Sequence, residues 1–371
     1  MSKNIAIVAN STWNIYNFRL NVLTKLIQEN WSVTVVAPID EYIEYKELYP
    51  TVKHIPLKSL VRDSTNPVGE LKLIAELRKI YKELQPDLVL HYTHKPNIFG
   101  GIAAKLAGVP SIAVITGLGY AFLNHGFFRS VTKFLYKLVG KVHSKFVFEN
   151  VDDLNMFVKE GIIKREQGVA VNGCGVDTEK YKPHPNGHIK PKTIFTFIGR
   201  LLYDKGIVEF VEAAQKVKAQ NPKTEFWIVG EMDEMNPSMV KKEELLKWIE
   251  KDDVIYHGFK KDILPIVAKS DCIVLPSYRE GMPRIVLEGM SMGKPIITTD
   301  TAGCRQTIVD KVSGYLVNVK DSKDLARGMF DFLNLTHQEA HEMGQKGRLR
   351  AVQLFNSQKI ATDLYDIVNE V

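Results

Sequence analysis

Short apolar runs alternate with stretches of helical periodicity through the first half of the chain. Each apolar run is five or six residues long, which suits a buried strand, whereas the periodic stretches place apolar residues three and four positions apart. We predict strands at 4–9, 32–37, 87–91 and 111–115, and helices at 18–29, 67–84 and 97–106. Strands and helices that alternate in this way favour a doubly wound parallel sheet.

The same alternation restarts after a segment rich in proline. Residues 181–192 hold three prolines and a glycine, which is typical of a linker. Beyond it we predict a helix at 207–219 and strands at 193–198, 225–230, 253–256, 271–275, 295–298 and 315–317. The chain is therefore predicted to form two α/β domains, 1–187 and 188–352, with a final helix within 353–371. Ligands of such sheets bind at the carboxyl ends of the strands.

The composition is that of an ordinary globular protein. The chain has 371 residues, of which 45% are hydrophobic and 25% charged. Its three cysteines (Cys174, Cys272 and Cys304) are far apart and match no metal-binding spacing, so we expect a reducing, cytosolic setting. The first residues lack the long apolar core of a signal peptide. The chain also has no run of about 18 apolar residues, so we predict no membrane-spanning helix.

The positive charge is concentrated in the first half. Residues 1–187 hold 23 Lys and Arg against 17 Asp and Glu, whereas residues 188–371 hold 26 of each. No acidic residue occurs between Asp87 and Glu149, and five cations recur there at every fourth position: Arg129, Lys133, Lys137, Lys141 and Lys145. On one helix this basic ladder would form a broad basic face beside apolar residues, which favours an anionic membrane surface as a partner. The alternative is a solvated helix that packs its apolar side on the domain core.

Two glutamates, Glu280 and Glu288, frame the most informative segment of the chain. Gly281 allows a ligand to approach the backbone closely, and Pro283 suits the first turn of a helix. The N–H groups at the start of such a helix attract an anion, so a carboxylate lies on each side of an anion site. This arrangement suits a nucleotide sugar, with a diphosphate between two groups that carry hydroxyls. The alternative is a capped, solvated surface helix.

The spacing of these two glutamates resembles the E-x7-E motif of retaining glycosyltransferases of family 4. The resemblance extends to the strand and loop at 271–277, the strand at 293–297 and the Gly-Arg segment at 199–206, which is similar to the family's diphosphate-binding loop. It covers nearly the whole chain and is strongest at about 195–320. It implies the GT-B fold, in which two Rossmann-like doubly wound domains face a cleft, and a final helix that crosses back to the first domain.

The resemblance also implies roles for residues on the donor side. Arg200 and Lys205 would stabilise the leaving diphosphate, Glu280 would contact the donor sugar, and Glu288 would accept hydrogen bonds from the ribose. Further donor-binding residues would be Gly199, Phe259, Gly281, Met282, Pro283 and Arg284. Because the chain contains no Asp-x-Asp, we expect neither a metal nor a cofactor. Simple surface charge is the alternative interpretation of both cations.

The acceptor side departs from the family pattern at one position. Thr116 and Gly117 stand where many members have His-Gly, and this form resembles a subgroup whose acceptors are undecaprenyl-diphosphate-linked sugars. His94 follows a predicted strand and matches a histidine of that subgroup, so we assign it a catalytic role, with a buried structural histidine as the alternative. Asn17 and Arg19 follow the first strand and are predicted to line the acceptor site.

These observations together predict a metal-independent retaining glycosyltransferase. It would transfer a sugar, an N-acetylhexosamine by resemblance, from a UDP-sugar to a polyprenyl-diphosphate-linked glycan. We expect it at the cytoplasmic face of the membrane, and we expect no nucleic-acid partner. The alternatives are a UDP-sugar epimerase with the same fold, which would need acid and base groups in the cleft, and a non-catalytic glycan-binding scaffold.

Overall fold

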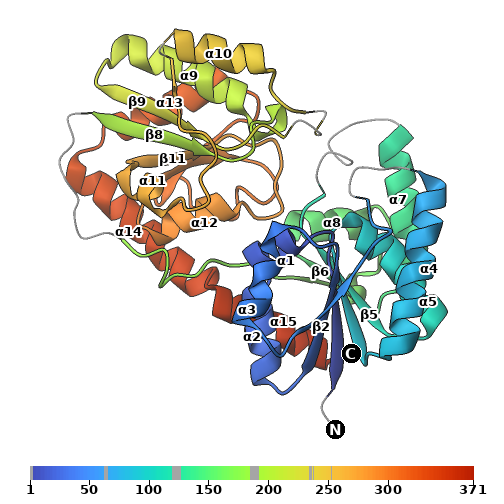
Figure 1. The fold of residues 1–371 in the computed structure, drawn as a ribbon. Helices are drawn as coiled ribbons and strands as arrows, with labels where there is room; N and C mark the ends of the chain where they lie inside the picture. The colour runs from blue at the N-terminus through green and yellow to red at the C-terminus, as the bar shows by residue number, and fades with distance from the viewer. Residues whose placement is uncertain are drawn as a thin grey trace. The chain divides into compact units, whose positions relative to one another are not determined.

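The chain divides into two compact units, each built around one parallel sheet (Figure 1). The computed structural model describes residues 3–61, 66–118, 127–183, 192–233, 236, 238–251 and 253–371. Unit 1 comprises Met1–Cys174 and Ser357–Val371, and unit 2 comprises Gly175–Asn356. The chain thus changes units at 174–175 and 356–357, whereas the sequence placed the boundaries at 187–188 and 352–353. Most of the predicted linker, 184–191, lies outside the described residues.

The sheet of unit 1 has seven parallel strands in the order β3-β2-β1-β4-β5-β6-β7. Its strands are β1 (Asn4–Val8), β2 (Ser32–Ala37), β3 (Lys53–Pro56), β4 (Leu88–Tyr92), β5 (Ser111–Ile115), β6 (Lys145–Phe148) and β7 (Gly168–Ala170). The central strands β1, β4 and β5 are almost wholly buried, because helices cover both faces of a parallel sheet. Four predicted strands are confirmed, while β3, β6 and β7 were not predicted.

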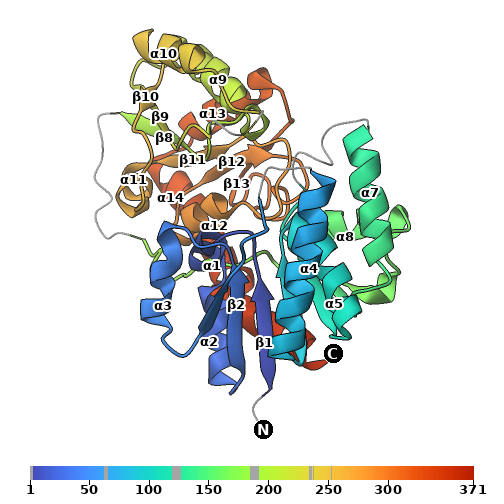
Figure 2. The same ribbon diagram turned by 45° about the vertical axis from the view of Figure 1, so that its right-hand side comes forward.

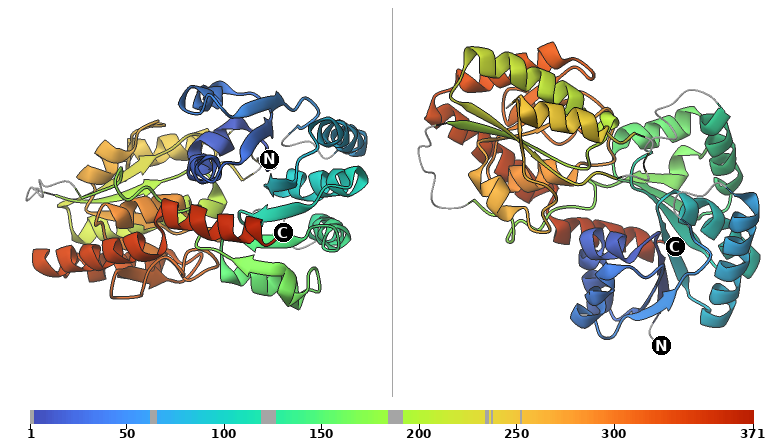
Figure 3. Two further views of the ribbon diagram at one scale, coloured as in Figure 1. Left: turned by 90° about the horizontal axis from the view of Figure 1, so that it is seen from below. Right: turned by 45° about the horizontal axis from the view of Figure 1, so that its top comes forward.

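Helices lie on both faces of this sheet, as Figure 2 shows. They are α1 (Thr12–Phe18), α2 (Leu20–Gln28), α3 (Tyr45–Leu48), α4 (Pro67–Leu84), α5 (Gly101–Ala107), α7 (Phe127–Val139), α8 (Val151–Lys159) and α15 (Ser357–Asn369), with short turns η1 (Glu41–Glu44), η2 (Pro96–Gly100) and η3 (Arg165–Gln167). On one face α2 and α15 share an apolar core with the strands, and on the other α4 and α5 do so. Helix α15 packs beside α2, so the end of the chain belongs to unit 1 (Figure 3).

Two helix predictions in unit 1 need correction. The predicted helix at 18–29 is confirmed as α2, but it is preceded by α1, which was not predicted and which ends at its C-cap, Arg19. The predicted helix at 97–106 begins as a π-helical turn, η2, before α5. A π turn is uncommon and often occurs at functional sites. Gly100 and Gly101 allow it to approach the sheet closely, since a Cβ at either position would lie 2.5 Å from a histidine ring.

Unit 2 has six parallel strands in the order β10-β9-β8-β11-β12-β13. They are β8 (Thr193–Ile198), β9 (Thr224–Val229), β10 (Ile255–Tyr256), β11 (Cys272–Leu275), β12 (Ile296–Thr299) and β13 (Gly314–Val317). All six predicted strands are confirmed within one or two residues at each end. Aromatic rings of β8 and β9 stack between the sheet and its helices, where Phe195 contacts Phe226 at a centroid distance of 5.4 Å.

The helices of unit 2 also cover both faces of the sheet. They are α9 (Ile207–Gln220), α10 (Lys242–Glu250), α11 (Leu264–Lys269), α12 (Arg284–Ser291), α13 (Ser322–Leu333) and α14 (His337–Leu354), with a short turn η4 (Tyr203–Lys205). Figure 1 shows α9 and α13 on one face and α12 and α14 on the other. Among the described residues of the whole chain, no helix is long and apolar enough to cross a membrane.

Candidate active site

The loop after β8 carries the first predicted cation of unit 2. Arg200 donates from Nη1 to Oδ2 of Asp233 at 2.8 Å, and Asp233 follows β9, the neighbouring strand. Gly206 closes the loop with a φ of +74°, and a Cβ there would lie 2.0 Å from the carbonyl oxygen of Pro276. The glycine therefore lets this loop lie against the carboxyl end of β11. Asp233 was not predicted as the partner of Arg200, because the two residues lie 33 positions apart in the chain.

Lys205 and Glu280 lie together at this edge of the sheet. The Nζ atom of Lys205 is 2.5 Å from Oε1 of Glu280, and the hydroxyl of Ser277 donates to the same oxygen at 2.6 Å. Ser277 is fully buried, and its carbonyl oxygen accepts a hydrogen bond from the Thr299 hydroxyl of β12. The Glu280 side chain is thus held by two donors from two loops. Ser277 ends the strand and loop at 271–277 that resemble the family pattern, but its contact with Glu280 was not predicted.

The backbone at Glu280 is supported from a third loop. Its N–H donates to the carbonyl oxygen of Ala302 at 3.1 Å. Gly303, with a φ of +78°, packs so closely that a Cβ would lie 2.4 Å from the carbonyl oxygen of Gly281. Because neither contact depends on a flexible side chain, the turn at 280–281 is held in one position. The strand-end loops therefore converge on the site that the glutamate spacing predicted.

Helix α12 begins where the sequence predicted, with Pro283 as its N-cap. Glu288 is buried in its second turn, and Nε of Arg284 donates to Oε1 of Glu288 at 2.7 Å. Burial raises the pKa of Glu288, while the charge of Arg284 and a hydrogen bond from Tyr181 act in the opposite direction. Arg284 thus pairs with a carboxylate one turn along its own helix. This ion pair was not predicted, since the sequence assigned Arg284 to donor binding.

The remaining predicted donor residues differ in exposure. Met282 is buried, and Gly281 is buried beside it in the turn before α12. Gly199 ends β8, next to Arg200. Phe259 follows β10, and the residue is 54% exposed to solvent. The structure brings Lys205 and Glu280 into direct contact, whereas no direct contact joins Arg200 or Phe259 to that pair in the described residues.

In unit 1, the predicted acceptor residues follow the carboxyl ends of β4 and β5. Thr116 and Gly117 come directly after β5, and Gly117 has a φ of +111°. His94 comes after β4, beyond Thr93, whose φ of +72° is unusual for a threonine. The Nδ1 atom of His94 lies 2.9 Å from the hydroxyl of Tyr136 in α7. Burial lowers the pKa of His94 to about 4, so the ring is neutral at physiological pH.

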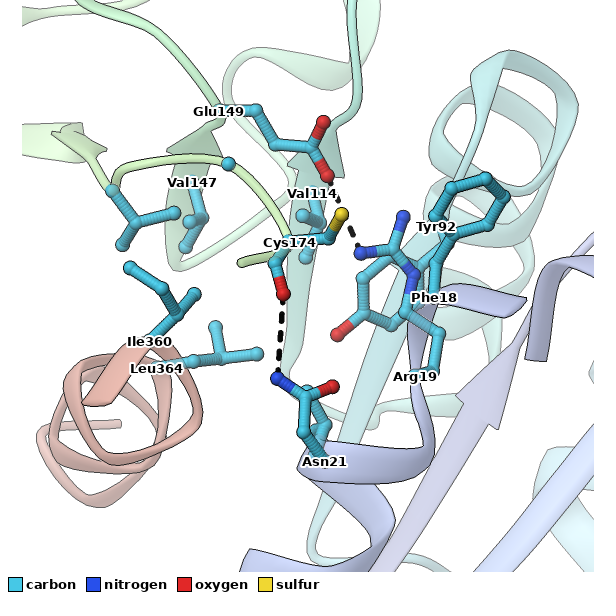
Figure 4. A pocket seen from close by; sticks show the side chains of 13 residues that line it. Phe18, Arg19, Asn21, Tyr92, Val114, Val147, Glu149, Cys174, Ile360 and Leu364 are labelled. Atoms are coloured by element: carbon cyan, nitrogen blue, oxygen red, sulfur yellow. Dashed lines mark hydrogen bonds and ion pairs between the residues drawn. The ribbon is translucent and has the colours of Figure 1, made fainter. Parts of the chain in front are cut away.

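Arg19 lies in a buried charge pair beside a small cavity (Figure 4). Its guanidinium contacts Oε1 of Glu149 at 3.3 Å and stacks over the ring of Tyr92 at 4.2 Å. Only 4% of Arg19 is exposed. Burial raises the pKa of Glu149, and the neighbouring guanidinium opposes this shift. These contacts are those of a structural residue, so the acceptor role of Arg19 stays a prediction without a structural contact that favours it.

Asn17 lies two residues before Arg19, near the end of α1. Its side-chain amide donates to the carbonyl oxygen of Trp13 at 3.0 Å, within the same helix. The side chain is partly exposed, so a ligand could replace this local hydrogen bond at small cost. Its acceptor role stays a prediction.

The basic ladder does not form one helical face. Helix α7 ends at Val139, Lys141 follows in a turn, and Lys145 begins strand β6. Glu160, just after α8, contacts both Arg129 at 3.2 Å and Lys133 at 2.8 Å. The prediction of a single basic face is therefore wrong, because the helix ends before Lys141, and Glu160 also offsets part of the positive charge. The side chains of Phe127 and Phe128, and residues 119–126, lie outside the described residues.

The exposed face of α7 is apolar instead. Its exposed large hydrophobic residues are Val131, Phe134 and Leu138, and the exposed lysines are Lys137 on the helix and Lys141 in the turn that follows it. The described residues contain no cluster of three or more His, Cys, Asp or Glu that could hold a metal ion.

Family comparisons agree with this division of the chain. A family described as "Glycosyl transferases group 1" matches residues 179–350, and one described as "Glycosyl transferase 4-like" matches residues 4–150. The N,N'-diacetylbacillosaminyl-diphospho-undecaprenol alpha-1,3-N-acetylgalactosaminyltransferase of Campylobacter jejuni is 32% identical over 342 residues, which is 87% of each chain. The UDP-Gal:alpha-D-GlcNAc-diphosphoundecaprenol alpha-1,3-galactosyltransferase of Escherichia coli is 30% identical over 77% of this chain and 74% of its own.

Solved structures show the same fold at lower identity. The Anabaena protein HepE in complex with UDP aligns with a TM-score of 0.80 at 18% identity, over 100% of both chains. A glycosyltransferase from Rickettsia africae aligns with a TM-score of 0.79 at 18% identity, over 100% of this chain and 98% of its own. With two parallel α/β sheets and a relative 32% identical over most of its length, this chain belongs to the glycosyltransferases of family 4, which have the GT-B fold.

Proposed function

We propose that this enzyme transfers an N-acetylhexosamine from a UDP-sugar to an undecaprenyl-diphosphate-linked saccharide. The observation that carries the proposal is the cluster of Lys205, Glu280 and Ser277 at the carboxyl edge of the unit 2 sheet, with Arg200 in the adjoining loop. The names of the two relatives support the acceptor class, since both include a diphospho-undecaprenol-linked sugar. Their donor sugars differ, so the choice of N-acetylhexosamine follows the relative that is more similar in sequence.

Arg200 and Lys205 would take part in the chemistry through charge. Negative charge develops on the diphosphate as the bond to the sugar breaks, and fixed cations stabilise that charge. Arg200 offers a planar fork for phosphate oxygens, and Lys205 offers a compact point charge. Asp233 and Glu280 balance these cations in the structure. A diphosphate would compete with Asp233 for Arg200, while Glu280 keeps Lys205 oriented and accepts a hydrogen bond from a donor hydroxyl.

Glu288 would bind the ribose of the nucleotide. It is buried beneath the start of α12 and already accepts a hydrogen bond from Arg284. A buried carboxylate is costly unless it is fully hydrogen-bonded, so ribose hydroxyls would complete its set of donors. No step of this proposal uses a metal, because Arg200, Lys205 and the start of α12 stabilise the negative charge of the diphosphate. The route is front-face displacement with retention, in which the leaving diphosphate accepts the proton of the acceptor hydroxyl.

We place the membrane contact of this enzyme on the exposed face of α7. Val131, Phe134 and Leu138 supply apolar area, and Lys137 and Lys141 supply charge that suits an anionic lipid surface. Arg129 and Lys133 contribute less, because both contact Glu160. This surface replaces the basic ladder as the proposed contact.

The function is tested by incubating the protein with labelled UDP-GalNAc, UDP-GlcNAc, UDP-Gal or UDP-Glc and an undecaprenyl-diphosphate-linked sugar. Label that enters the lipid extract from an N-acetylhexosamine donor is the expected result, with Lys205→Ala as the inactive control. Transfer of Gal or Glc alone would contradict the donor assignment. Interconversion of UDP-sugars without an acceptor would instead identify an epimerase.

A further inference from the structure

Tyr278 joins the two loops that carry the Lys205–Glu280 pair. It lies two residues before Glu280 in the segment after β11, and its backbone N–H donates to the carbonyl oxygen of Asp204 at 2.9 Å. Asp204 directly precedes Lys205 in the segment after β8. Since β8 and β11 are neighbours in the sheet, this hydrogen bond fixes one loop against the other, one residue from the cation.

The hydroxyl of Tyr278 reaches the chain on the other side of Lys205. It donates to Oε1 of Glu209 at 2.7 Å, and Glu209 lies in the first turn of α9, which begins two residues after Lys205. Burial and the Glu209 carboxylate raise the pKa of Tyr278, so the phenol keeps its proton at neutral pH. Tyr278 therefore binds the chain both before and after Lys205, through its backbone at Asp204 and through its side chain at Glu209.

The Glu209 carboxylate depends on this contact. Its second oxygen, Oε2, is buried and has no hydrogen-bond partner within the described part of the chain. A buried carboxylate without donors is costly, so the tyrosine hydroxyl stabilises the first turn of α9 in its observed position. Removal of the hydroxyl would therefore act on the start of α9 and, through Gly206, on Lys205.

Two further loops hold Tyr278 itself. Its carbonyl oxygen accepts from the hydroxyl of Thr301, which follows β12, at 2.9 Å. Lys320 follows β13, and its Nζ atom lies 4.7 Å from the centroid of the Tyr278 ring, where the aromatic face attracts an ammonium group. Tyr278 is thus held by the loops after β8, β12 and β13 and by α9.

We propose that Tyr278 is a positioning residue for sugar transfer, which holds Lys205 and Glu280 at the separation that the leaving diphosphate requires. The roles of Lys205 and Glu280 rest on the proposed function, whereas the contacts of Tyr278 do not. Tyr278 acts through these two side chains and needs no contact with the substrate. A small displacement of a fixed charge lowers the rate, because the charge then no longer faces the oxygen on which negative charge develops.

Tyr278→Phe removes the hydroxyl and keeps the ring beside Lys320. We expect kcat to fall about 10-fold and KM for the donor to stay within about twofold, because a misplaced Lys205 affects the transition state more than binding of the ground state. Tyr49→Phe is the matched control, since it removes a tyrosine hydroxyl that lies 2.7 Å from the Thr24 hydroxyl in unit 1. Equal losses of kcat in the two folded variants, or a loss confined to KM, would overturn the inference.

Variants of Glu209 test whether the hydroxyl acts through this carboxylate. Glu209→Gln keeps an oxygen that can accept from the Tyr278 hydroxyl, so it should keep kcat within about threefold. Glu209→Ala should lose about as much as Tyr278→Phe, and the double variant should lose no more than either single one, since both changes remove the same hydrogen bond. Losses that multiply in the double variant would show that the two residues act independently and would overturn the inference.

The position of the ion pair can be measured without a substrate. In crystal structures, wild type and Tyr49→Phe should keep Nζ of Lys205 in contact with Oε1 of Glu280, and Tyr278→Phe should show this contact lengthened or lost. A pair that stays in place in Tyr278→Phe would overturn the inference and leave the proposed function intact. A normal kcat in Lys205→Ala would instead contradict the proposed function, on which the catalytic part of the inference rests.

Discussion

Both units place polar side chains after the carboxyl ends of parallel strands, but the two sets differ in charge. In unit 2 the groups are ion pairs, with Lys205 at 2.5 Å from Glu280 and Arg200 at 2.8 Å from Asp233. In unit 1 the group after β4 is a neutral pair, His94 and Tyr136, while the ion pair of Arg19 with Glu149 after β6 is buried. The ion pairs at the strand ends of unit 2 are thus partly exposed, whereas the ion pair of unit 1 is buried and its partly exposed histidine is neutral. The difference agrees with the proposal that unit 2 binds the leaving diphosphate and unit 1 the acceptor hydroxyl.

The largest effect is expected from the cations of unit 2. Arg200→Ala or Lys205→Ala should each lower kcat by roughly 100-fold or more, because each removes fixed charge from the developing diphosphate. Lys192, which contacts Glu225 at 2.9 Å, is a matched control in the same unit. Initial rates of sugar transfer give the measurement. A loss in Lys192→Ala as large as that in Lys205→Ala would show that the effect is one of general charge.

Variants of Glu280 and Glu288 should affect sugar transfer and UDP binding separately. Glu288→Ala should weaken UDP binding about 10-fold or more, as for lost hydrogen bonds to a charged group, while Glu280→Ala should spare UDP affinity and lower kcat. Calorimetric titration with UDP and transfer assays measure the two quantities. Equal UDP affinity in wild type and Glu288→Ala would remove Glu288 from the ribose role.

Ser277 should matter through Glu280. Ser277→Ala removes the hydrogen bond of 2.6 Å to Oε1 of Glu280 and should lower kcat about 10-fold, with little change in UDP affinity. Ser277→Thr keeps a hydroxyl and should recover part of the rate if its extra methyl group fits. A thermal melt checks that the buried site still folds. A shift in UDP affinity without a change in kcat would place Ser277 in nucleotide binding instead.

The surface of α7 should give a smaller, graded effect. We expect liposome co-sedimentation to fall most in Phe134→Ser/Leu138→Ser, because an inserted apolar side chain contributes roughly 1.5–3 kcal/mol and a lysine near an anionic surface about 1 kcal/mol. Lys137→Gln/Lys141→Gln should weaken binding less, and more visibly at low salt. Lys133→Gln, matched in charge to Lys137→Gln but paired with Glu160, is the control. Wild-type sedimentation of all three variants would contradict a membrane contact on α7.

The smallest expected effect is that of chelation. Transfer should persist in EDTA, because the proposed charge stabilisation comes from Arg200, Lys205 and the start of α12. Initial rates before and after dialysis against EDTA give the measurement. Loss of activity that Mg²⁺ or Mn²⁺ restores would contradict the metal-independent mechanism.

The sequence by itself determined most of the fold and the main elements of the donor site. The strand ranges of β2, β5 and β8 and the helix range of α4 agree with their predictions, because apolar runs and helical periodicity report burial locally. The start of α12 after Pro283 could also be predicted from the residue types in this segment. Glu280 lies before the helix and Glu288 lies within it.

Only the tertiary structure decided which groups meet. Arg200, Lys133 and His94 meet partners that lie 33, 27 and 42 residues further along the chain, Asp233, Glu160 and Tyr136, and the packing of strands and helices brings each pair together. The mistaken basic ladder has another cause: a spacing of four predicts one helical face only while the helix continues, and α7 ends before Lys141. Local patterns encode which face of an element is buried, whereas the packing of distant elements sets which charged and polar partners each functional group meets.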